Sequence, residues 1–341
     1  MSIAVIILNY NGQQWLEACL SAAQTATQML STPVEIVVAD NASQDNSLAY
    51  LQEHWPWVRV LAFEKNYGFA EGYNRAIASV PAEWVVMLNT DAVLSPNWLT
   101  TLLAFAEHHP HAAILGGKLL LGGKSGSQRI LQAVGSRLTD AGTAFEVGWG
   151  QPDVGQFSEP HITASIPAAA LLIRRATFLR LGGFDADYFA YLEDVDLCWR
   201  AWLTGDEVWC VPTAEATHHF GGTAGGRASP FRIQWMQRNR YANMLKHLAW
   251  PTFVSGILTS IIYDAYRVLE FSLTGQWAAL RALAVGTWAA FRALPKLWAA
   301  RQNIQANRQR SDAELRAKGL LVSAYTAFQE YRRLAPAGPD G

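Results

Sequence analysis

Short apolar runs alternate with segments of helical periodicity along the first hundred residues. The apolar runs are nearly continuous, as in parallel strands covered on both faces, and they occupy residues 3–8 (IAVIIL), 34–39 (VEIVVA), 58–62 and 84–88 (WVVML). The helical segments between them span residues 13–29, 44–53 and 69–79. Strands that alternate with helices of this length predict right-handed βαβ units, and therefore an open, mostly parallel α/β sheet with helices on both faces.

Each of these four predicted strands is followed by a polar cluster. In chain order the clusters read NYNG, DNAS, NYG and NTD. Because ligands of open α/β sheets bind at the carboxyl ends of the strands, we expect the four clusters to converge on one crevice.

The pattern is weaker between residues 121 and 161, where GGKSGSQR and GWGQPDVGQ indicate long loops. Such loops form either a lid over an acceptor or a surface excursion, and the surface excursion is the simpler interpretation. Order returns with a predicted buried strand at residues 168–174 (AAALLIR), a helix over LEDVDLCWRAW and a strand at residues 207–211.

The chain changes character after Arg240. Residues 248–263 (LAWPTFVSGILTSIIY) carry no charge, but Pro251 and Gly256 interrupt them. They also fall short of the roughly 20 apolar residues that a membrane-spanning helix needs. Further on, between residues 281 and 318, eight Lys and Arg side chains accompany two acidic ones.

Basic residues spaced along Trp-rich apolar helices are typical of helices that lie on an anionic membrane surface. We therefore divide the chain into an α/β domain over residues 1–247 and a C-terminal apolar and basic helical region over residues 248–341. Two alternatives stay open for the second region: packing on the α/β domain or on a second subunit of a homo-oligomer, and a true membrane span.

Composition narrows the class of protein. Half of the residues are hydrophobic, only 16% are charged and 14 are Trp, whereas soluble domains carry about 25% charged residues. The net charge of −1 gives no basis for nucleic-acid binding. The three cysteines show no CxxC spacing, which favours buried, reduced thiols. The first residues, MSIAVIILNYNG, lack a basic segment and a cleavage site, so we expect a first strand rather than a signal peptide, and a cytoplasmic location.

Two aspartates follow predicted strands. Asp40, in ADNAS, could accept the ring N–H of a pyrimidine base, although Asn41, Ser43 and Asp45 beside it could equally cap the next helix. Asp91, in NTD, could hold a divalent cation already bound by a diphosphate, since Mg²⁺ binds through one or two carboxylates and phosphate oxygens. Alone, Asp91 could also be a simple turn residue.

Two further segments suggest a binding site. The turn from Asn66 to Asn74 (NYGFAEGYN) enters a helix through Gly68, where the backbone could approach an anion. It is not the GxGxxG fingerprint of dinucleotide-binding proteins, which does not occur in the chain. His218 and His219 precede a Gly-Gly turn, and one of them could be a second ligand to the same metal.

Six motifs in order resemble the family 2 glycosyltransferases, most of all the bacterial rhamnosyltransferase-like branch of cell-surface polysaccharide assembly. They are ILNYNG, VVADNASQDNS, NYGFAEGYN, MLNTDAVL, GGFDADYFAYLEDVDLCWRAWLTG and HHFGGT. The resemblance covers residues 3 to about 247. It implies a glycosyltransferase-A (Rossmann-like) fold, a nucleoside-diphosphate sugar donor, a divalent cation (Mg²⁺ or Mn²⁺) and inversion at the anomeric carbon.

The resemblance also assigns residues to the donor and the metal. Asp40 matches the family's base-binding aspartate, and Asn9 and Asn11 flank the same pocket. Asp91 matches the last aspartate of the metal-binding DXD motif, whose first acidic position is here Asn89, so metal affinity is expected to be reduced. His218 matches the metal-ligating histidine, with His219 as the alternative. We add Asn66 and Gly68 to the donor site, and Arg238 as a basic residue near the diphosphate.

The stretch YLEDVDLCWR contains three carboxylates in an apolar setting. By resemblance, Asp194 is the general base that takes the proton of the attacking acceptor hydroxyl. Glu193 is expected to shape the acceptor site, since neighbouring helical residues point about 100° apart and cannot share one role. Asp196 is expected to pair with Arg200 four residues on, and Leu192, Val195 and Trp199 to hold the helix on the core.

The sequence thus predicts an inverting glycosyltransferase in cell-surface polysaccharide biosynthesis, peripheral on the inner face of the cell membrane. Its expected partners are a dTDP- or UDP-linked sugar, with rhamnose as the best guess, and a glycan or polyprenyl-linked acceptor. The alternative is a non-catalytic scaffold of the same fold that binds sugar nucleotides or glycans, which the loss of a carboxylate at Asn89 favours and the intact Glu193–Asp194 pair opposes. A dehydrogenase is disfavoured by the missing glycine fingerprint.

Overall fold

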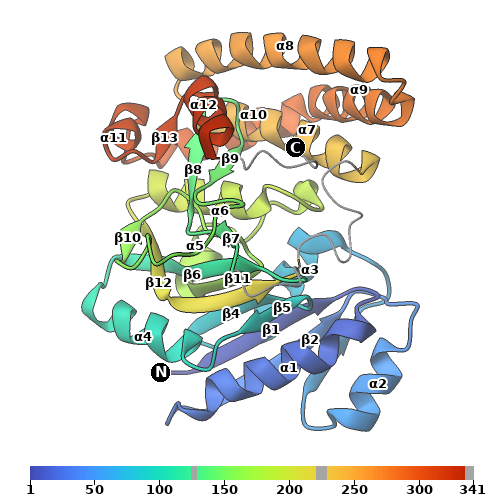
Figure 1. The fold of residues 1–341 in the computed structure, drawn as a ribbon, viewed down its shortest axis with the longest axis vertical. Coiled ribbons are helices and arrows are strands. Elements are labelled where there is room, and N and C mark those ends of the chain that lie inside the picture. The colour runs from blue at the N-terminus through green and yellow to red at the C-terminus, as the bar shows by residue number, and fades with distance from the viewer. Residues whose placement is uncertain (124–128, 220–228, 335–341) are drawn as a thin grey trace.

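The computed structural model describes residues 1–123, 129–219 and 229–334, and it is built around a central sheet with helices on both faces (Figure 1). Among the described residues the main sheet has ten strands. Its first half is parallel and consists of β3 (Arg59–Ala62), β2 (Val34–Asp40), β1 (Ile3–Asn9) and β4 (Trp84–Asn89), in that order.

The second half of the sheet is mixed. β11 (Ala170–Arg174) runs antiparallel to both β4 and β6 (Ala112–Leu121), and β12 (Glu207–His218) is parallel to β6. Shorter strands complete it: β5 (Ala92–Leu94) and β10 (His161–Ile162) pair with β12, and β7 (Leu131–Ala133) pairs with β6. The expected open α/β sheet is confirmed. The antiparallel direction of β11 was not predicted.

Alternate side chains of the strands enter two hydrophobic cores, because successive residues of a strand point to opposite faces. Val5 and Ile7 pack with α1 (Gln13–Gln28), α2 (Ser47–His54) and α4 (Trp98–His108). Ala4 and Ile6 pack in the other core with α3 (Gly68–Ala78), α5 (Arg175–Arg180) and α6 (Glu193–Leu203). Both faces are therefore covered, as the continuous apolar runs predict.

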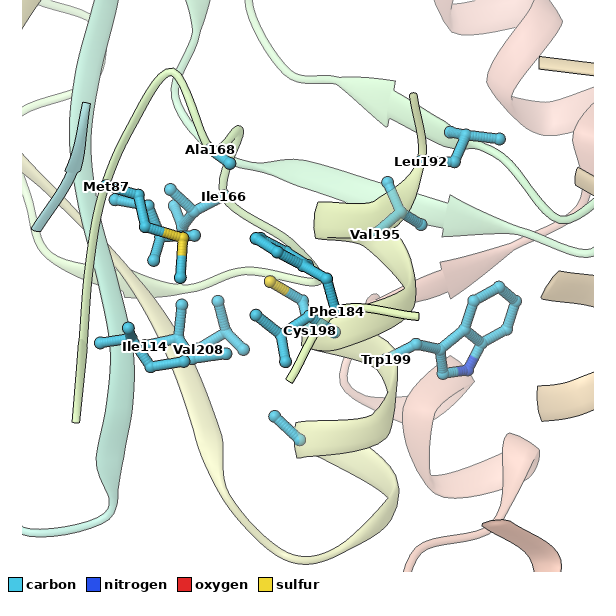
Figure 2. Close-up of a cluster of buried hydrophobic side chains, with 14 of the residues drawn as sticks. Met87, Ile114, Ile166, Ala168, Phe184, Leu192, Val195, Cys198, Trp199 and Val208 are labelled. Carbon is cyan, nitrogen blue, oxygen red and sulfur yellow. The ribbon is translucent and has the colours of Figure 1, made fainter. Parts of the chain in front are cut away.

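Helix α6 is buried on more than one side (Figure 2). Cys198 lies toward the sheet residues Met87, Ile114 and Val208, whereas Trp199 points to the opposite side of the helix. There Trp199 stacks on His247 of α7 (Pro230–His247), with ring centroids 4.9 Å apart. Trp199 therefore holds α6 to α7 rather than to the sheet.

The predicted helix at residues 44–53 begins later than expected, at Ser47. The carboxylate of Asp45 accepts hydrogen bonds from the backbone N–H groups of Ser47 (3.0 Å) and Gln13 (3.0 Å). This local bonding competes with the helix and keeps the preceding residues in a loop. The other two early helices are confirmed to within one residue at each end, whereas α4 and β6 were not predicted.

Residues 129–161, within the segment at residues 121–161, are more ordered than their composition indicates, whereas residues 124–128 of the predicted GGKSGSQR loop lie outside the described ranges. Besides β7 the segment contains β8 (Ser136–Thr139) and β9 (Ala144–Glu146), which form a small sheet with β13 (Leu321–Val322) from the C-terminal region. The segment is therefore not a plain surface excursion, and it is tied to residues nearly two hundred positions away.

The C-terminal region is helical, as expected. It consists of α8 (Trp250–Leu273), α9 (Trp277–Arg292), α10 (Leu294–Ala306), α11 (Asp312–Ala317), β13 and α12 (Ala324–Leu334). In Figure 1, α8 and α9 form the outermost layer at the end of the molecule farthest from α1. In the described ranges, no helix is both long and apolar enough to cross a membrane.

Pro251 and Gly256 do not interrupt α8, contrary to our expectation. Pro251 lies in the first turn of the helix, where a missing N–H costs nothing. Gly256 allows a close approach, because a Cβ atom there would lie 2.1 Å from the carbonyl oxygen of Asp140. The glycine therefore lets α8 pack on the loop after β8.

Several basic residues of the C-terminal region are used within the fold. Arg301 donates to the carbonyls of Leu245 (2.5 Å) and Leu248 (2.8 Å), and Arg310 donates to those of Gly205 (2.7 Å) and Asp206 (2.5 Å). These bonds satisfy carbonyl groups at the ends of α7 and α6. Because Arg301 and Arg310 are occupied, the surface charge that remains for a membrane is smaller than the expected excess.

Residues on both sides of position 247 share one core. Leu297, Leu315 and Leu320 are buried in the same cluster as α6 and the sheet. The boundary at residue 247 therefore stays a prediction about function, and it does not coincide with a gap in packing.

Candidate functional site

A cavity of about 870 Å³ opens at the carboxyl ends of β1, β2 and β4. It is lined by residues from every predicted polar cluster and by the start of α6. Those that we predicted as site residues are Asn66, Gly68, Asn89, Asp91, Glu193, Asp194 and His218. The polar clusters therefore do converge on one crevice.

Asp40 lies behind the wall of this cavity. Its side chain is fully buried and accepts hydrogen bonds from Asn9 Nδ2 (2.8 Å) and the backbone N–H of Ser43 (2.9 Å). Asn11 Oδ1 accepts from the N–H of Gln44 (2.7 Å), and Tyr10, between the two asparagines, lines the cavity. Asp40 and Asn9 therefore support the cavity wall from behind, and Tyr10 is the residue of the first polar cluster that faces the cavity.

The N-terminus of α3 is not an open anion site. The N–H groups of Tyr67 and Gly68 donate to Asn41 Oδ1 (2.8 Å) and Asn66 Oδ1 (2.8 Å). Those of Phe69 and Ala70 both donate to the carbonyl of Phe189 (2.6 and 3.3 Å). Because all four N–H groups have acceptors, this helix end has no free N–H group for an anion, contrary to our expectation.

Asp91 and His218 meet in the cavity wall. Nε2 of His218 lies 3.2 Å from Oδ1 of Asp91, and Nδ1 lies 2.9 Å from Oε1 of Gln132. Their neighbour His219 packs instead against Trp15, with ring centroids 4.7 Å apart and the rings tilted by 33°, and is not part of the lining. The geometry thus favours His218 over His219 as a metal ligand.

These residues fit a divalent cation. A carboxylate and an imidazole nitrogen converge on one point, and Asn89 lines the cavity beside them. The described residues contain no group of three or more His, Cys, Asp or Glu side chains that could hold a metal. A site with two protein ligands suits a cation that also binds phosphate oxygens of a substrate.

Glu193 and Asp194 begin α6 and both line the cavity. Asp194 accepts from the N–H groups of Ala168 (3.1 Å) and Val195 (2.8 Å), and burial raises its pKa against the effect of these bonds. Burial, with the nearby charge of Asp194, raises the pKa of Glu193 well above its usual range. In the described part of the chain Oε2 of Glu193 has no hydrogen-bond partner. Glu193 and Asp194 therefore both face the cavity, but Asp194 accepts hydrogen bonds from backbone N–H groups, whereas Oε2 of Glu193 accepts none among the described residues.

Asp196 points the other way, into a buried polar cluster. It accepts from Nε of Arg200 (2.9 Å) and lies 2.5 Å from Nζ of Lys246. Burial acts to raise its pKa, but Arg200 and Lys246 hold that pKa well below the usual range. The expected pairing with Arg200 is present, and Lys246 extends it to α7.

Arg238 is not near the cavity. It is buried in α7, where it donates to Asn239 Oδ1 (2.9 Å) and lies over the ring of Tyr188. Arg232, almost two helical turns earlier, lines the cavity instead. The predicted role of Arg238 near a diphosphate is therefore corrected, because residues six apart on a helix face different sides.

Sequence reasoning missed part of the cavity wall. Gln132, Glu146 and Trp149 come from the segment at residues 121–161, and Phe231 and Arg232 from the first turn of α7. The Trp and Glu side chains in FEVGWG are the signal that could have marked this segment as part of a site, since both types bind sugar rings and hydroxyls.

Comparison with known proteins agrees with this geometry. The model of the family described as Glycosyl transferase family 2 matches residues 4–176, a range that contains the first four of the six motifs, and it confirms the resemblance to this family. An N-acetylglucosaminyl-diphospho-decaprenol L-rhamnosyltransferase of Mycobacterium tuberculosis is 29% identical over 243 residues, covering 65% of this chain and 78% of that protein. The rhamnosyltransferase WbbL of Escherichia coli is 28% identical, covering 45% of this chain and 61% of that protein.

Solved structures share the fold. TarS residues 1–349 of S. aureus, in complex with UDP-GlcNAc, aligns with a TM-score of 0.56 at 18% identity, over 99% of this chain and 93% of that one. GalNAc-T7 with UDP, GalNAc and Mn²⁺ aligns with a TM-score of 0.53 at 15% identity, over 72% of this chain and about half (51%) of that one. At these identities the likeness supports the glycosyltransferase-A fold.

Proposed function

We propose that this chain, which belongs to glycosyl transferase family 2 and is a glycosyltransferase, transfers a sugar with inversion at the anomeric carbon. The proposed acceptor is a lipid-linked or glycan acceptor in cell-surface polysaccharide biosynthesis. The proposed donor is dTDP-rhamnose and the proposed transferred sugar is rhamnose, because two of the relatives are rhamnosyltransferases. The mycobacterial relative is an N-acetylglucosaminyl-diphospho-decaprenol L-rhamnosyltransferase, and this supports a polyprenyl-linked acceptor for the present chain.

The observation that carries the proposal is that two kinds of group share one cavity. Asp91 and His218 would hold the divalent cation on one wall, and Asp194 lies at the start of α6 on another. A bound Mg²⁺ or Mn²⁺ would stabilise the negative charge that develops on the departing diphosphate. A leaving-group site and a base in one cavity are what a single displacement at the anomeric carbon requires.

Asp194 is the proposed general base. As the acceptor oxygen forms its bond to the anomeric carbon, the bond from that carbon to the diphosphate oxygen breaks, and the hydroxyl proton passes to Asp194. Retention would need a second, nucleophilic carboxylate. Glu193 is a poor candidate because burial raises its pKa well above the usual range, which disfavours the charged carboxylate that a nucleophile must supply. Its proposed role is to bind the acceptor, and the result is inversion.

The donor is proposed to bind along the ends of β1, β2 and β4. Asn66, Gly68 and Asn89 line this part of the cavity, and Asp40 with Asn9 and Asn11 supports the end assigned to the pyrimidine base. Arg232 takes the place that we first gave to Arg238 near the diphosphate.

We also place the protein on the cytoplasmic face of the cell membrane, through α8 and α9. Apolar side chains such as Leu258 (59% exposed), Ile262 (72%) and Trp288 (62%) face outward from these helices. Arg281 and Arg292 are exposed beside them. Exposed apolar and aromatic side chains with basic neighbours suit an anionic lipid surface, which would bring the cavity to a membrane-bound acceptor.

A donor panel tests the proposal. The purified chain, with Mn²⁺ or Mg²⁺ and a polyprenyl-diphosphate sugar acceptor, is expected to release nucleoside diphosphate from dTDP-rhamnose faster than from UDP sugars, in step with glycosylated acceptor. Binding of every nucleotide sugar without release, under the same conditions, would instead support the non-catalytic scaffold.

A further inference from the structure

The turn that leads into Glu193 and Asp194 is held in an unfavourable backbone conformation. Phe189, Tyr191 and Leu192 have φ angles of 57°, 69° and 65°. Left-handed conformations are unfavourable for bulky side chains, and they persist only where the surrounding structure enforces them. Since Leu192 directly precedes α6, this turn sets the direction in which the carboxylates of the first helical turn point.

One buried side chain bonds the backbone of this whole turn. Nδ2 of Asn239, on α7, donates to the carbonyls of Tyr188 (3.0 Å), Ala190 (3.0 Å) and Tyr191 (2.7 Å). Its Oδ1 accepts from Arg238 (2.9 Å), which fixes the orientation of the amide. Asn239 is fully buried and does not line the cavity.

The opposite side of the turn is fixed by α3. The carbonyl of Phe189 accepts from the N–H groups of Phe69 and Ala70, and a Cβ atom on Gly68 would lie 2.5 Å from the ring of Phe189. The turn is therefore clamped between α3, which borders the donor end of the cavity, and Asn239.

We propose that Asn239 is a positioning residue for the transfer reaction, which holds the turn at residues 188–192 so that Asp194 meets the acceptor hydroxyl. This inference rests on the proposed function of Asp194. Asn239 touches no substrate, and it acts through the three carbonyls that it binds. A displacement of the base of about 1 Å can lower a rate about 100-fold.

Two substitutions test the role. Asn239→Ala removes all three bonds and is expected to lower kcat about 10- to 100-fold. The KM for the donor should change little, because the proposed donor site lies along the ends of β1, β2 and β4. Asn239→Asp keeps the shape but puts a carboxylate against three carbonyls. Its kcat, as a ratio to the wild type, is expected to rise as the pH falls, because the protonated carboxyl group can again donate a hydrogen bond.

Gln237→Ala is the matched control. Gln237 is also a buried amide on α7, but it donates to Asp264 (2.7 Å) on α8 and Thr287 (3.0 Å) on α9, away from the turn. Its loss is expected to lower the melting temperature of the protein and to leave kcat per folded molecule unchanged. The comparison separates positioning from a general loss of stability.

The outcomes are distinct. An Asn239→Ala protein that folds with wild-type kcat, or an Asn239→Asp protein whose kcat ratio does not change with pH, overturns the positioning role. If neither variant folds at any pH while Gln237→Ala does, Asn239 supports the fold as a whole and the inference is also rejected. A wild-type chain without turnover contradicts the proposed function itself.

Discussion

The Nε2 atom of His218 lies 3.2 Å from the Oδ1 atom of Asp91, while Nδ1 of the same ring lies 2.9 Å from Oε1 of Gln132. An amide oxygen can only accept a hydrogen bond, so Nδ1 carries the proton that it shares with Gln132. Nε2 then faces Asp91, so these two side chains would hold a divalent cation, and Gln132 would orient the ring for it.

The first prediction concerns metal affinity. Gln132→Ala leaves both ligands in place but frees the ring of His218, and it is expected to weaken Mn²⁺ binding about 10- to 100-fold. Calorimetric titration of Mn²⁺ in the presence of nucleoside diphosphate measures the change. His219→Ala is the control and should bind Mn²⁺ as the wild type does. If His219→Ala loses Mn²⁺ binding and His218→Ala does not, His219 and not His218 is the metal ligand.

The second prediction concerns pH. Because burial raises the pKa of Asp194, the base becomes protonated at a higher pH than an ordinary aspartate, whose pKa is about 3.9. The kcat of the enzyme is therefore expected to fall on the acidic side as the pH decreases through this raised pKa. Burial and the nearby charge of Asp194 raise the pKa of Glu193 as well, so ionisation of Asp194 favours the neutral form of Glu193.

Glu193→Gln provides the check on this assignment. Glutamine resembles the neutral acid, so the acidic limb of the kcat profile should stay where it is. A limb that disappears in Glu193→Gln would show that Glu193, and not Asp194, is the group that titrates.

The third prediction concerns stability. Asp196→Asn leaves the buried cations of Arg200 and Lys246 without their shared carboxylate, and the free energy of unfolding is expected to drop by about 3–5 kcal/mol. Chemical denaturation at neutral pH measures it. The pKa of Asp196 is depressed in the folded state, so its contribution is complete above the unfolded pKa and is lost as the pH falls through the folded one.

The difference in the free energy of unfolding between the wild type and Asp196→Asn should therefore become smaller below about pH 4. A difference that is small at neutral pH, or that widens in acid, would contradict the assignment of Asp196 to the α6–α7 contact.

The fourth prediction concerns membrane binding. Leu258→Asp combined with Ile262→Asp places two charges on the exposed face of α8, and it is expected to weaken binding to anionic vesicles about 10-fold or more. Sedimentation with vesicles containing phosphatidylglycerol measures the effect. Leu179→Asp, at an exposed leucine of α5, is the matched control. Unchanged vesicle binding, together with a loss of self-association, would mean that a second copy of the chain covers this face.

The sequence predicted the catalytic crevice well, since each strand of the parallel half ends in its own polar cluster. Asn89, Asp91, Glu193, Asp194 and His218 all line the cavity because strand order and hydrophobic pattern determine where these chain positions lie. The local pattern also explains the start of α6, whose acidic first turn is visible in LEDVD.

The remaining features depend on contacts between distant segments. Arg301 and Arg310 count as surface charges in the sequence, yet they bond backbone carbonyls of α7 and of the loop after α6. In the sequence Gly256 suggests a break in the helix, but in the structure it allows α8 to pack closely on the backbone of Asp140. Asn239 lies 45 residues after Asp194 along the chain, and only the packing of α7 on the turn reveals its three bonds.

The most direct measurement of the central claim is the rate of sugar transfer by Asp194→Asn. Asparagine keeps the size of the side chain but cannot take up the proton, so kcat for glycosylated acceptor is expected to fall about 100- to 10,000-fold, while nucleotide-sugar binding measured by calorimetry is retained. Transfer at the wild-type rate by a folded Asp194→Asn protein would contradict the account.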